Sequence, residues 1–195
     1  MKIIGFTAKK QTGKTTAVKY LLKKYPHAYH VNFKDALIEE LIQYCPELLT
    51  EIGRIYDNSP ATYDGTPWTT ERLFTEKPPL IRSLMRDWGT VFRRSEAPNY
   101  WIHKWVRKMA QIEKDTPDAM VFVDDVRFLN EAQAVKDLGG VLIRIESDRV
   151  ITKDPHQSEA EMDEIAIDHL IVNKWKHVNE LYRQLDIIMP AYDRP

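Results

Sequence analysis

Short hydrophobic runs alternate with amphipathic stretches along most of the chain. Five runs rich in apolar side chains predict strands over 2–7, 27–33, 119–124, 141–145 and 169–172. Apolar positions at helical spacing predict helices over 13–24, 34–45, 80–94, 99–113, 129–138 and 174–188. Strands that alternate with helices predict an α/β protein with a central parallel sheet and helices on both faces, which makes three layers.

Two segments depart from this alternation. Residues 46–79 are rich in Pro, Thr, Asp and Tyr and predict an excursion with little regular structure, although a helix could extend over 48–55. Residues 147–164 are charged, follow a strand and predict a mobile, lid-like segment. We expect a single domain over 1–195, with a largely helical insertion over 46–118.

Composition narrows the class of protein. The 195 residues are 43% hydrophobic and 29% charged with a net charge of −1, which does not favour a polymeric nucleic acid as partner. The one cysteine, Cys45, excludes an internal disulfide and a Cys-based zinc site. The chain begins with a strand pattern and has no apolar run of membrane-spanning length, so we expect a cytoplasmic protein with no membrane contact.

The junction between the first strand and the first helix carries the strongest chemical signal. Residues 8–15 read Ala-Lys-Lys-Gln-Thr-Gly-Lys-Thr, the phosphate-binding P-loop pattern with Ala8 in place of its first glycine. Lys14 can reach the β- and γ-phosphates of ATP, and the Thr15 hydroxyl can bind Mg²⁺. A chance Gly-Lys-Thr is the alternative, but the order strand, loop, helix favours the motif. The expected ATP-binding residues here are Lys10, Gln11, Thr12, Gly13, Lys14, Thr15 and Thr16.

A second signal lies at the end of the strand over 119–124. Its tip carries Asp124 and Asp125, and a carboxylate there can hold Mg²⁺ opposite Thr15. The two side chains point to opposite sides, so which of them faces the metal stays open; we assign Asp124 to the metal and Asp125 to catalysis, with Lys14 and Arg127. Arg127 could clamp a phosphate with two N–H groups. Alternatively, the aspartates cap the next helix and Arg127 pairs with Glu131.

Further motifs follow one another in a fixed order. They are Asn-Phe-Lys-Asp-Ala-Leu at 32–37, Arg-Ser-Leu-Met-Arg-Asp-Trp-Gly-Thr at 82–90, Asp-Val-Arg-Phe-Leu-Asn-Glu-Ala at 125–132, Leu-Gly-Gly at 138–140, Ile-Arg-Ile at 143–145, His-Gln-Ser-Glu at 156–159 and Asp-His-Leu-Ile-Val-Asn at 168–173. With the P-loop, this series resembles the bacteriophage deoxynucleoside monophosphate kinases over nearly the whole chain, least over 46–79. The chain departs from that family's pattern at Ala8, Thr15 and Arg86.

The resemblance implies transfer of the γ-phosphoryl group of ATP to a deoxynucleoside 5′-monophosphate in the host cytoplasm, with 46–118 binding the acceptor. Such an acceptor carries about two negative charges and needs cations rather than a general base. Arg82 and Arg86 share a helix face, and Trp88 could stack on a base, although exposed surface and helix packing explain these residues as well. Arg149 could close over ATP. The expected substrate-binding residues are Lys34, Asp35, Arg82, Arg86, Trp88, Arg127, Asn130, Glu131, His156, Ser158 and Glu159.

Two other functions stay open at this point. One is a P-loop kinase for another small acceptor, such as dephospho-coenzyme A or phosphomevalonate. The other is a nucleotide-binding switch or ATPase that hydrolyses ATP without an acceptor. The accepted base and the choice between ribose and deoxyribose are not readable from the residues. The aromatic-rich segment 56–74 is a candidate surface for a homodimer.

Overall fold

The computed structural model describes residues 1–9, 12–147, 157–174 and 177–193, and the side chains of 157–160 lie outside that description. The chain forms two compact units. The sheet unit comprises Met1–Phe33 and Ile102–Pro195, and the helical unit comprises Lys34–Trp101. No helix within the described ranges is both long enough and apolar enough to span a membrane.

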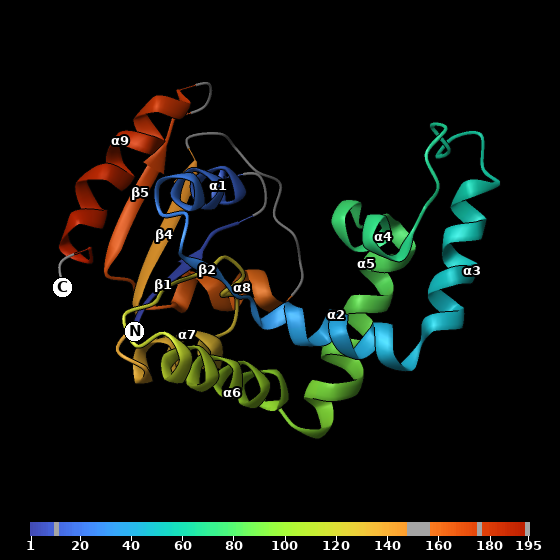
Figure 1. The fold of residues 1–195 in the computed structure, drawn as a ribbon, viewed down its shortest axis with the longest axis horizontal. Helices are drawn as coiled ribbons and strands as arrows, with labels where there is room; N and C mark the ends of the chain where they lie inside the picture. Colours follow the sequence, from blue (N-terminus) through green and yellow to red (C-terminus); the bar gives the residue numbers. More distant parts are fainter. Residues whose placement is uncertain (10–11, 148–156, 175–176, 194–195) are drawn as a thin grey trace. The chain divides into compact units, whose positions relative to one another are not determined.

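A five-stranded parallel sheet forms the centre of the sheet unit (Figure 1). Its strands are β1 (Lys2–Thr7), β2 (Tyr29–His30), β3 (Met120–Val123), β4 (Val141–Ser147) and β5 (His169–Asn173), in the spatial order β2-β3-β1-β4-β5. Every neighbouring pair is parallel, and Gly5 of β1 lies opposite both Val123 of β3 and Leu142 of β4. The carboxyl ends of all five strands therefore meet at one edge, where ligands bind in sheets of this kind.

Successive residues of the central strands point to opposite faces of the sheet. Ile3 and Val121 contribute to the core beneath α6 (Tyr100–Asp115), α7 (Leu129–Asp137) and α8 (Gln157–Glu164). Ile4 and Phe122 contribute to the core beneath α1 (Lys14–Lys24), α9 (Val178–Ile188) and the short η2 (Met189–Ala191). This period of two, with helices on each side, confirms the predicted three-layer α/β class.

The helical unit has an apolar core of its own. It contains α2 (Phe33–Tyr44, from Lys34 onward), α3 (Pro46–Asp57), α4 (Thr70–Glu76), α5 (Pro79–Arg86) and a π-helix, η1 (Asp87–Arg94). Fully buried side chains of this core include Leu41, Leu49, Leu73 and Ile81. The prediction of little regular structure over 46–79 was therefore wrong, since α3 and α4 occupy much of that segment.

Two of the residues that made 46–79 look irregular, Pro46 and Thr69, are helix-start signals. Pro46 occupies the first turn of α3, where the missing N–H costs nothing. The Thr69 side chain caps α4 by accepting a hydrogen bond from the Arg72 amide at 3.2 Å. Gly53 lets α3 approach the next loop, because a Cβ there would come within 2.5 Å of the Trp68 carbonyl oxygen.

Three boundaries differ from the predictions. The strand over 27–33 is shorter, because β2 is an edge strand and Phe33 already begins α2. The helix over 80–94 divides into α5 and η1. Part of the lid-like segment, 157–164, is the helix α8, whereas 148–156 lie outside the described residues.

Candidate active site

The P-loop connects β1 to α1 at the sheet's ligand-binding edge. Gly13 sits at the start of α1 with φ 101°, which favours glycine, and a Cβ there would come within 2.5 Å of the Asn173 Nδ2 atom. Lys14 begins the helix and is half-buried, whereas Thr15 and Thr16 are exposed in its first turn. The first N–H groups of a helix have no partner within the helix itself, which makes such a turn suited to an anion. Lys10 and Gln11 lie outside the described residues.

Asn173, which the sequence offered only as part of a motif, supports this loop. Its Nδ2 atom donates a hydrogen bond to the Thr12 carbonyl oxygen at 2.8 Å, so the end of β5 holds the loop backbone. Within the loop, the Thr12 hydroxyl donates to the Lys9 carbonyl oxygen at 3.0 Å. These two contacts hold Thr12 between Asn173 and Lys9.

Alanine is compatible with the first P-loop position. Lys77 is the only non-glycine residue with positive φ in the described part of the chain, so Ala8 does not adopt the left-handed conformation. The departure from the glycine pattern therefore introduces no backbone strain at this position.

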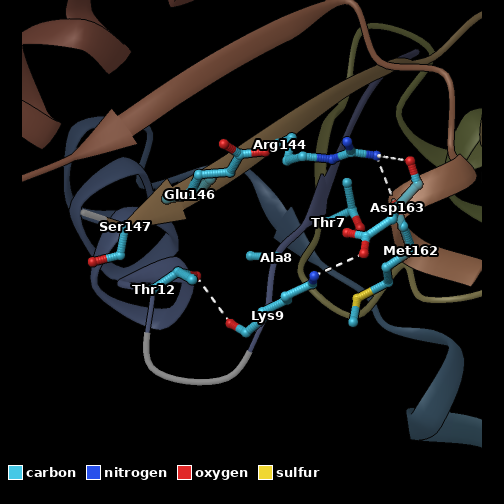
Figure 2. A pocket seen from close by; sticks show the side chains of 10 residues that line it. Thr7, Ala8, Lys9, Thr12, Arg144, Glu146, Ser147, Met162 and Asp163 are labelled. Carbon is cyan, nitrogen blue, oxygen red and sulfur yellow. Dashed lines mark hydrogen bonds and ion pairs between the residues drawn. The ribbon is translucent and has the colours of Figure 1, made fainter. Parts of the chain in front are cut away.

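A cavity of about 320 Å³ lies beside the P-loop, between the ends of β1 and β4 and the helix α8 (Figure 2). The Lys9 ammonium pairs with the Asp163 carboxylate at 2.8 Å. Arg144 donates to the carbonyl oxygens of Met162 at 2.7 Å and Ile165 at 2.8 Å, so its charge caps the end of α8. The Thr7 hydroxyl is buried and has no hydrogen-bond partner among the described residues.

Asp124 and Asp125 follow β3 and have different surroundings. Asp125 accepts a hydrogen bond from the Phe33 amide at 3.0 Å, so its carboxylate caps α2. The Asp124 carboxylate is 12% exposed and lies 3.5 Å from His30 Nε2, while its own amide donates to the Asn32 side chain at 2.7 Å. The alternative that the aspartates cap the next helix is therefore wrong for Asp125, which caps α2 instead.

Glu131, rather than either aspartate, caps α7. Its carboxylate accepts hydrogen bonds from the amides of Arg127 at 2.8 Å and Phe128 at 3.2 Å, and the residue is only 3% exposed. The alternative pairing of the Arg127 side chain with Glu131 does not form. Arg127 is exposed, and its guanidinium makes no hydrogen bond or ion pair within the described ranges.

The Glu131 cap predicts a structural effect of substitution. Glu131→Ala should lower the free energy of unfolding by about 1–2 kcal/mol, because two amides at the start of α7 lose their acceptor. Urea denaturation without nucleotide measures this. Gln133→Ala, an exposed change on the same helix, is the control and should have a much smaller effect. Equal stability of the two variants would contradict the capping role.

The other predicted site residues divide between the two units. Arg82 is exposed on α5, and Arg86 pairs with Asp87 at 3.0 Å. Trp88 is half-buried and donates its indole N–H to Glu40 at 3.1 Å. Three more of the predicted substrate-binding residues are half-buried, and each already makes a contact: Lys34, Asp35 and Asn130. His156 and Arg149 lie outside the described residues, as do the side chains of Ser158 and Glu159.

Asp168 begins the motif that ends at Asn173 and joins two elements of the sheet unit. Its carboxylate accepts hydrogen bonds from the Lys136 ammonium and from the Leu142 amide, the latter at 2.7 Å. Burial alone would raise the pKa of this carboxyl, but the Lys136 charge and the amide outweigh it and lower the pKa. The motif is therefore a structural support, which its spacing in the sequence did not reveal.

The donor set fits a magnesium ion that arrives with a nucleotide. No group of three or more His, Cys, Asp or Glu side chains in the described part of the protein could hold a metal by itself. Mg²⁺ is commonly bound by one or two carboxylates together with substrate phosphates and water. Asp124 at the tip of β3 and the exposed Thr15 hydroxyl are donors of this kind.

The strand order, the parallel sheet and the loop that ends with Gly13 before α1 define an α/β fold of the P-loop type. Two solved structures are similar to it: dephospho-CoA kinase from Campylobacter jejuni (15% identity, TM-score 0.50) and TT1252 from Thermus thermophilus (18% identity, TM-score 0.50). Each comparison covers 98% of both chains. At these identities the likeness concerns the fold alone.

Sequence comparison identifies the family. The family model described as deoxynucleotide monophosphate kinase matches residues 54–185. A protein of Acanthamoeba polyphaga mimivirus named "Putative deoxynucleotide monophosphate kinase" is 31% identical over 192 residues, which cover 95% of this chain and 94% of the relative. The chain belongs to the deoxynucleotide monophosphate kinase family. The predicted resemblance is thereby confirmed.

Proposed function

We propose that this protein transfers the γ-phosphoryl group of ATP to the phosphate of a deoxynucleoside 5′-monophosphate. An acceptor phosphate oxygen forms the new bond to phosphorus, the bond between the γ-phosphorus and the bridging oxygen breaks, and the products are ADP and a deoxynucleoside diphosphate. The observation that carries the proposal is the Gly13–Lys14–Thr15 turn at the start of α1, in a chain of this family.

On the donor side, the first turn of α1 binds the β-phosphate through its amides, and Lys14 neutralises charge on the β- and γ-phosphates. Asn173 supports this arrangement by holding the Thr12 carbonyl oxygen next to α1. Mg²⁺, when bound at Thr15 and Asp124, would neutralise charge on the phosphates. Asp125, which caps α2, positions the backbone next to Asp124 rather than removing a proton.

The cavity beside the P-loop supports phosphate binding near Lys9. The Lys9–Asp163 pair is exposed on both sides, and exposed ion pairs contribute little to stability. A phosphate can therefore replace Asp163 as the partner of Lys9 at small cost. This change would leave α8 attached to β4 through Arg144.

On the acceptor side, cations rather than a base do the chemical work. The monophosphate is already a nucleophile near neutral pH, because its second pKa is about 6. Arg127 has an exposed guanidinium without a partner in the described residues, so it is available to a phosphate. Arg82, on the helical unit, is exposed in the same way. Two N–H groups of a guanidinium match two phosphate oxygens.

A phosphoryl-transfer profile tests this function. The purified protein is incubated with ATP, Mg²⁺ and one of dTMP, dGMP, dCMP, dAMP, dephospho-coenzyme A or phosphomevalonate, and the products are separated by ion-exchange chromatography. We expect diphosphate from at least one deoxynucleoside monophosphate, and ADP formation that rises when that acceptor is added. Transfer to dephospho-coenzyme A alone, or ATP hydrolysis that no acceptor stimulates, would contradict the proposal.

A further inference from the structure

A buried carboxylate organises one face of the helical unit. The Glu40 side chain, on α2, is only 1% exposed. It accepts hydrogen bonds from Arg93 Nε at 2.6 Å, Tyr100 Oη at 2.8 Å and Trp88 Nε1 at 3.1 Å. A carboxylate removed from water needs such donors, because desolvation of an unpaired charge costs several kcal/mol.

The π-helix brings two of these donors to the same carboxylate. Trp88 and Arg93 are five residues apart, and in an α-helix such positions point about 140° away from each other. In a π-helix, residue i is hydrogen-bonded to residue i+5, so the two side chains lie on one face. The Trp101 indole N–H donates to the Gly89 carbonyl at 2.9 Å, which adds a hydrogen bond to the backbone of this irregular segment.

Arg93 is held firmly but is not enclosed. Its guanidinium carbon lies 4.8 Å from the Phe92 ring centroid, 5.0 Å from that of Tyr100 and 5.6 Å from that of Trp88. Glu40 binds Nε and Nη2, whereas Nη1 has no hydrogen-bond partner among the residues that the structure describes. The side chain is 23% exposed. One edge of a fixed guanidinium therefore remains available to a ligand.

Stability alone does not account for this arrangement. A buried ion pair is often no more stabilising than apolar side chains of similar size. What it supplies is orientation, since a guanidinium anchored by a carboxylate and flanked by rings loses little further freedom when it binds. Burial is the largest single influence on Arg93 and disfavours its charged form, but the hydrogen bond that it donates to Glu40 and the negative charge of Glu40 together outweigh burial and raise its pKa, so the group stays charged.

We propose that Arg93 binds the phosphate monoester of the acceptor nucleotide through its free edge, and that Glu40 is the positioning residue that orients it. This proposal rests on the proposed function, because it assigns the acceptor phosphate to a particular side chain of the helical unit. The ligand class is a phosphate monoester, whose oxygens accept the N–H groups that Glu40 leaves unused. Glu40 acts through Arg93 and does not itself touch the nucleotide.

Three variants test the proposal. Arg93→Lys keeps the charge and can still pair with Glu40, but it loses the planar second edge. Glu40→Gln keeps the shape but weakens the anchor of the guanidinium. Arg54→Lys is the control, because Arg54 lies on α3 of the same unit in an exposed ion pair with Glu51. Thermal unfolding establishes that each variant folds.

The readout is monophosphate affinity rather than activity alone. Calorimetry measures binding of the deoxynucleoside monophosphate that the wild type binds best, and steady-state kinetics give KM for that monophosphate and for ATP. We expect Arg93→Lys to raise Kd and KM for the monophosphate about fivefold, while KM for ATP is unchanged. Glu40→Gln should shift the same two constants in the same direction, and Arg54→Lys should change none of them.

The outcomes separate the two proposals. If Arg93→Lys folds and binds the monophosphate as tightly as the wild type, the proposed role of Arg93 is overturned. This holds even if Glu40→Gln does not fold, and it leaves the proposed kinase function unaffected. If the wild-type protein phosphorylates no monophosphate, the proposed kinase function is overturned. Calorimetry of monophosphate binding to the wild type and to Arg93→Lys still decides whether Arg93 binds the phosphate. Equal weakening of monophosphate and ATP binding would show a general structural effect and would also overturn the proposal.

Discussion

Lys14→Ala is expected to lower kcat by about 10²- to 10³-fold, the largest loss that we predict for a single substitution. Lys14 begins α1 at the proposed phosphate-binding turn, where its charge would act most strongly on the group being transferred. The loss should therefore appear in kcat more than in KM for ATP. Initial rates of diphosphate formation over a range of ATP concentrations measure it.

The structural control for this substitution lies on the same helix. Lys19 is exposed on α1, outside the P-loop, so Lys19→Ala removes one lysine charge without touching the phosphate site. Circular dichroism and melting temperature should be nearly the same for the wild type and both variants. A Lys14→Ala protein that keeps near wild-type turnover would refute the P-loop assignment.

Arg127→Lys is expected to lower kcat/KM at least tenfold, which corresponds to about 1.4 kcal/mol of transition-state stabilisation. Lysine keeps the charge but loses the planar grip on two phosphate oxygens. Glu131 accepts hydrogen bonds from backbone amides in this turn, so changing the Arg127 side chain leaves the start of α7 intact. Steady-state kinetics with both substrates measure the effect, and the melting temperature should stay within a few degrees of the wild type.

Arg107→Lys provides the comparison for Arg127. Arg107 is also an exposed arginine of the sheet unit, on α6, and no predicted function involves it. Its substitution should leave kcat/KM unchanged. If Arg127→Lys also left kcat/KM unchanged, Arg127 would be an ordinary surface residue, and its assignment to catalysis would be refuted.

Local sequence patterns predicted most of the strands and helices of the sheet unit. β1 begins and ends at the predicted residues, because a buried strand next to a glycine-containing turn leaves little freedom in its boundaries. The helix after the P-loop and the strand that ends before Asp124 were predicted nearly to the residue. These elements combine a hydrophobic period with strong start or stop residues, so neighbouring segments alone specify them.

Polar side chains in the motifs were harder to interpret, because the same residue type can bind a ligand or support the backbone. Glu131 and Asp168 both lie in motifs of the family, but they accept hydrogen bonds from backbone amides of the fold. Asn173 holds the P-loop from a strand that is 161 residues away from Thr12 in the sequence. Spacing along the chain carries no information about such a contact.

The sequence by itself determined the α/β class, the P-loop and the family, because these depend on local periodicity and on ordered motifs. Only the tertiary structure decided that Asp125 caps α2, that Thr69 starts a helix, and that Glu40 anchors Arg93. The physical reason is the same in each case. The free energy of a buried polar group depends on donors and acceptors supplied by distant segments, and these come together only when the chain has folded.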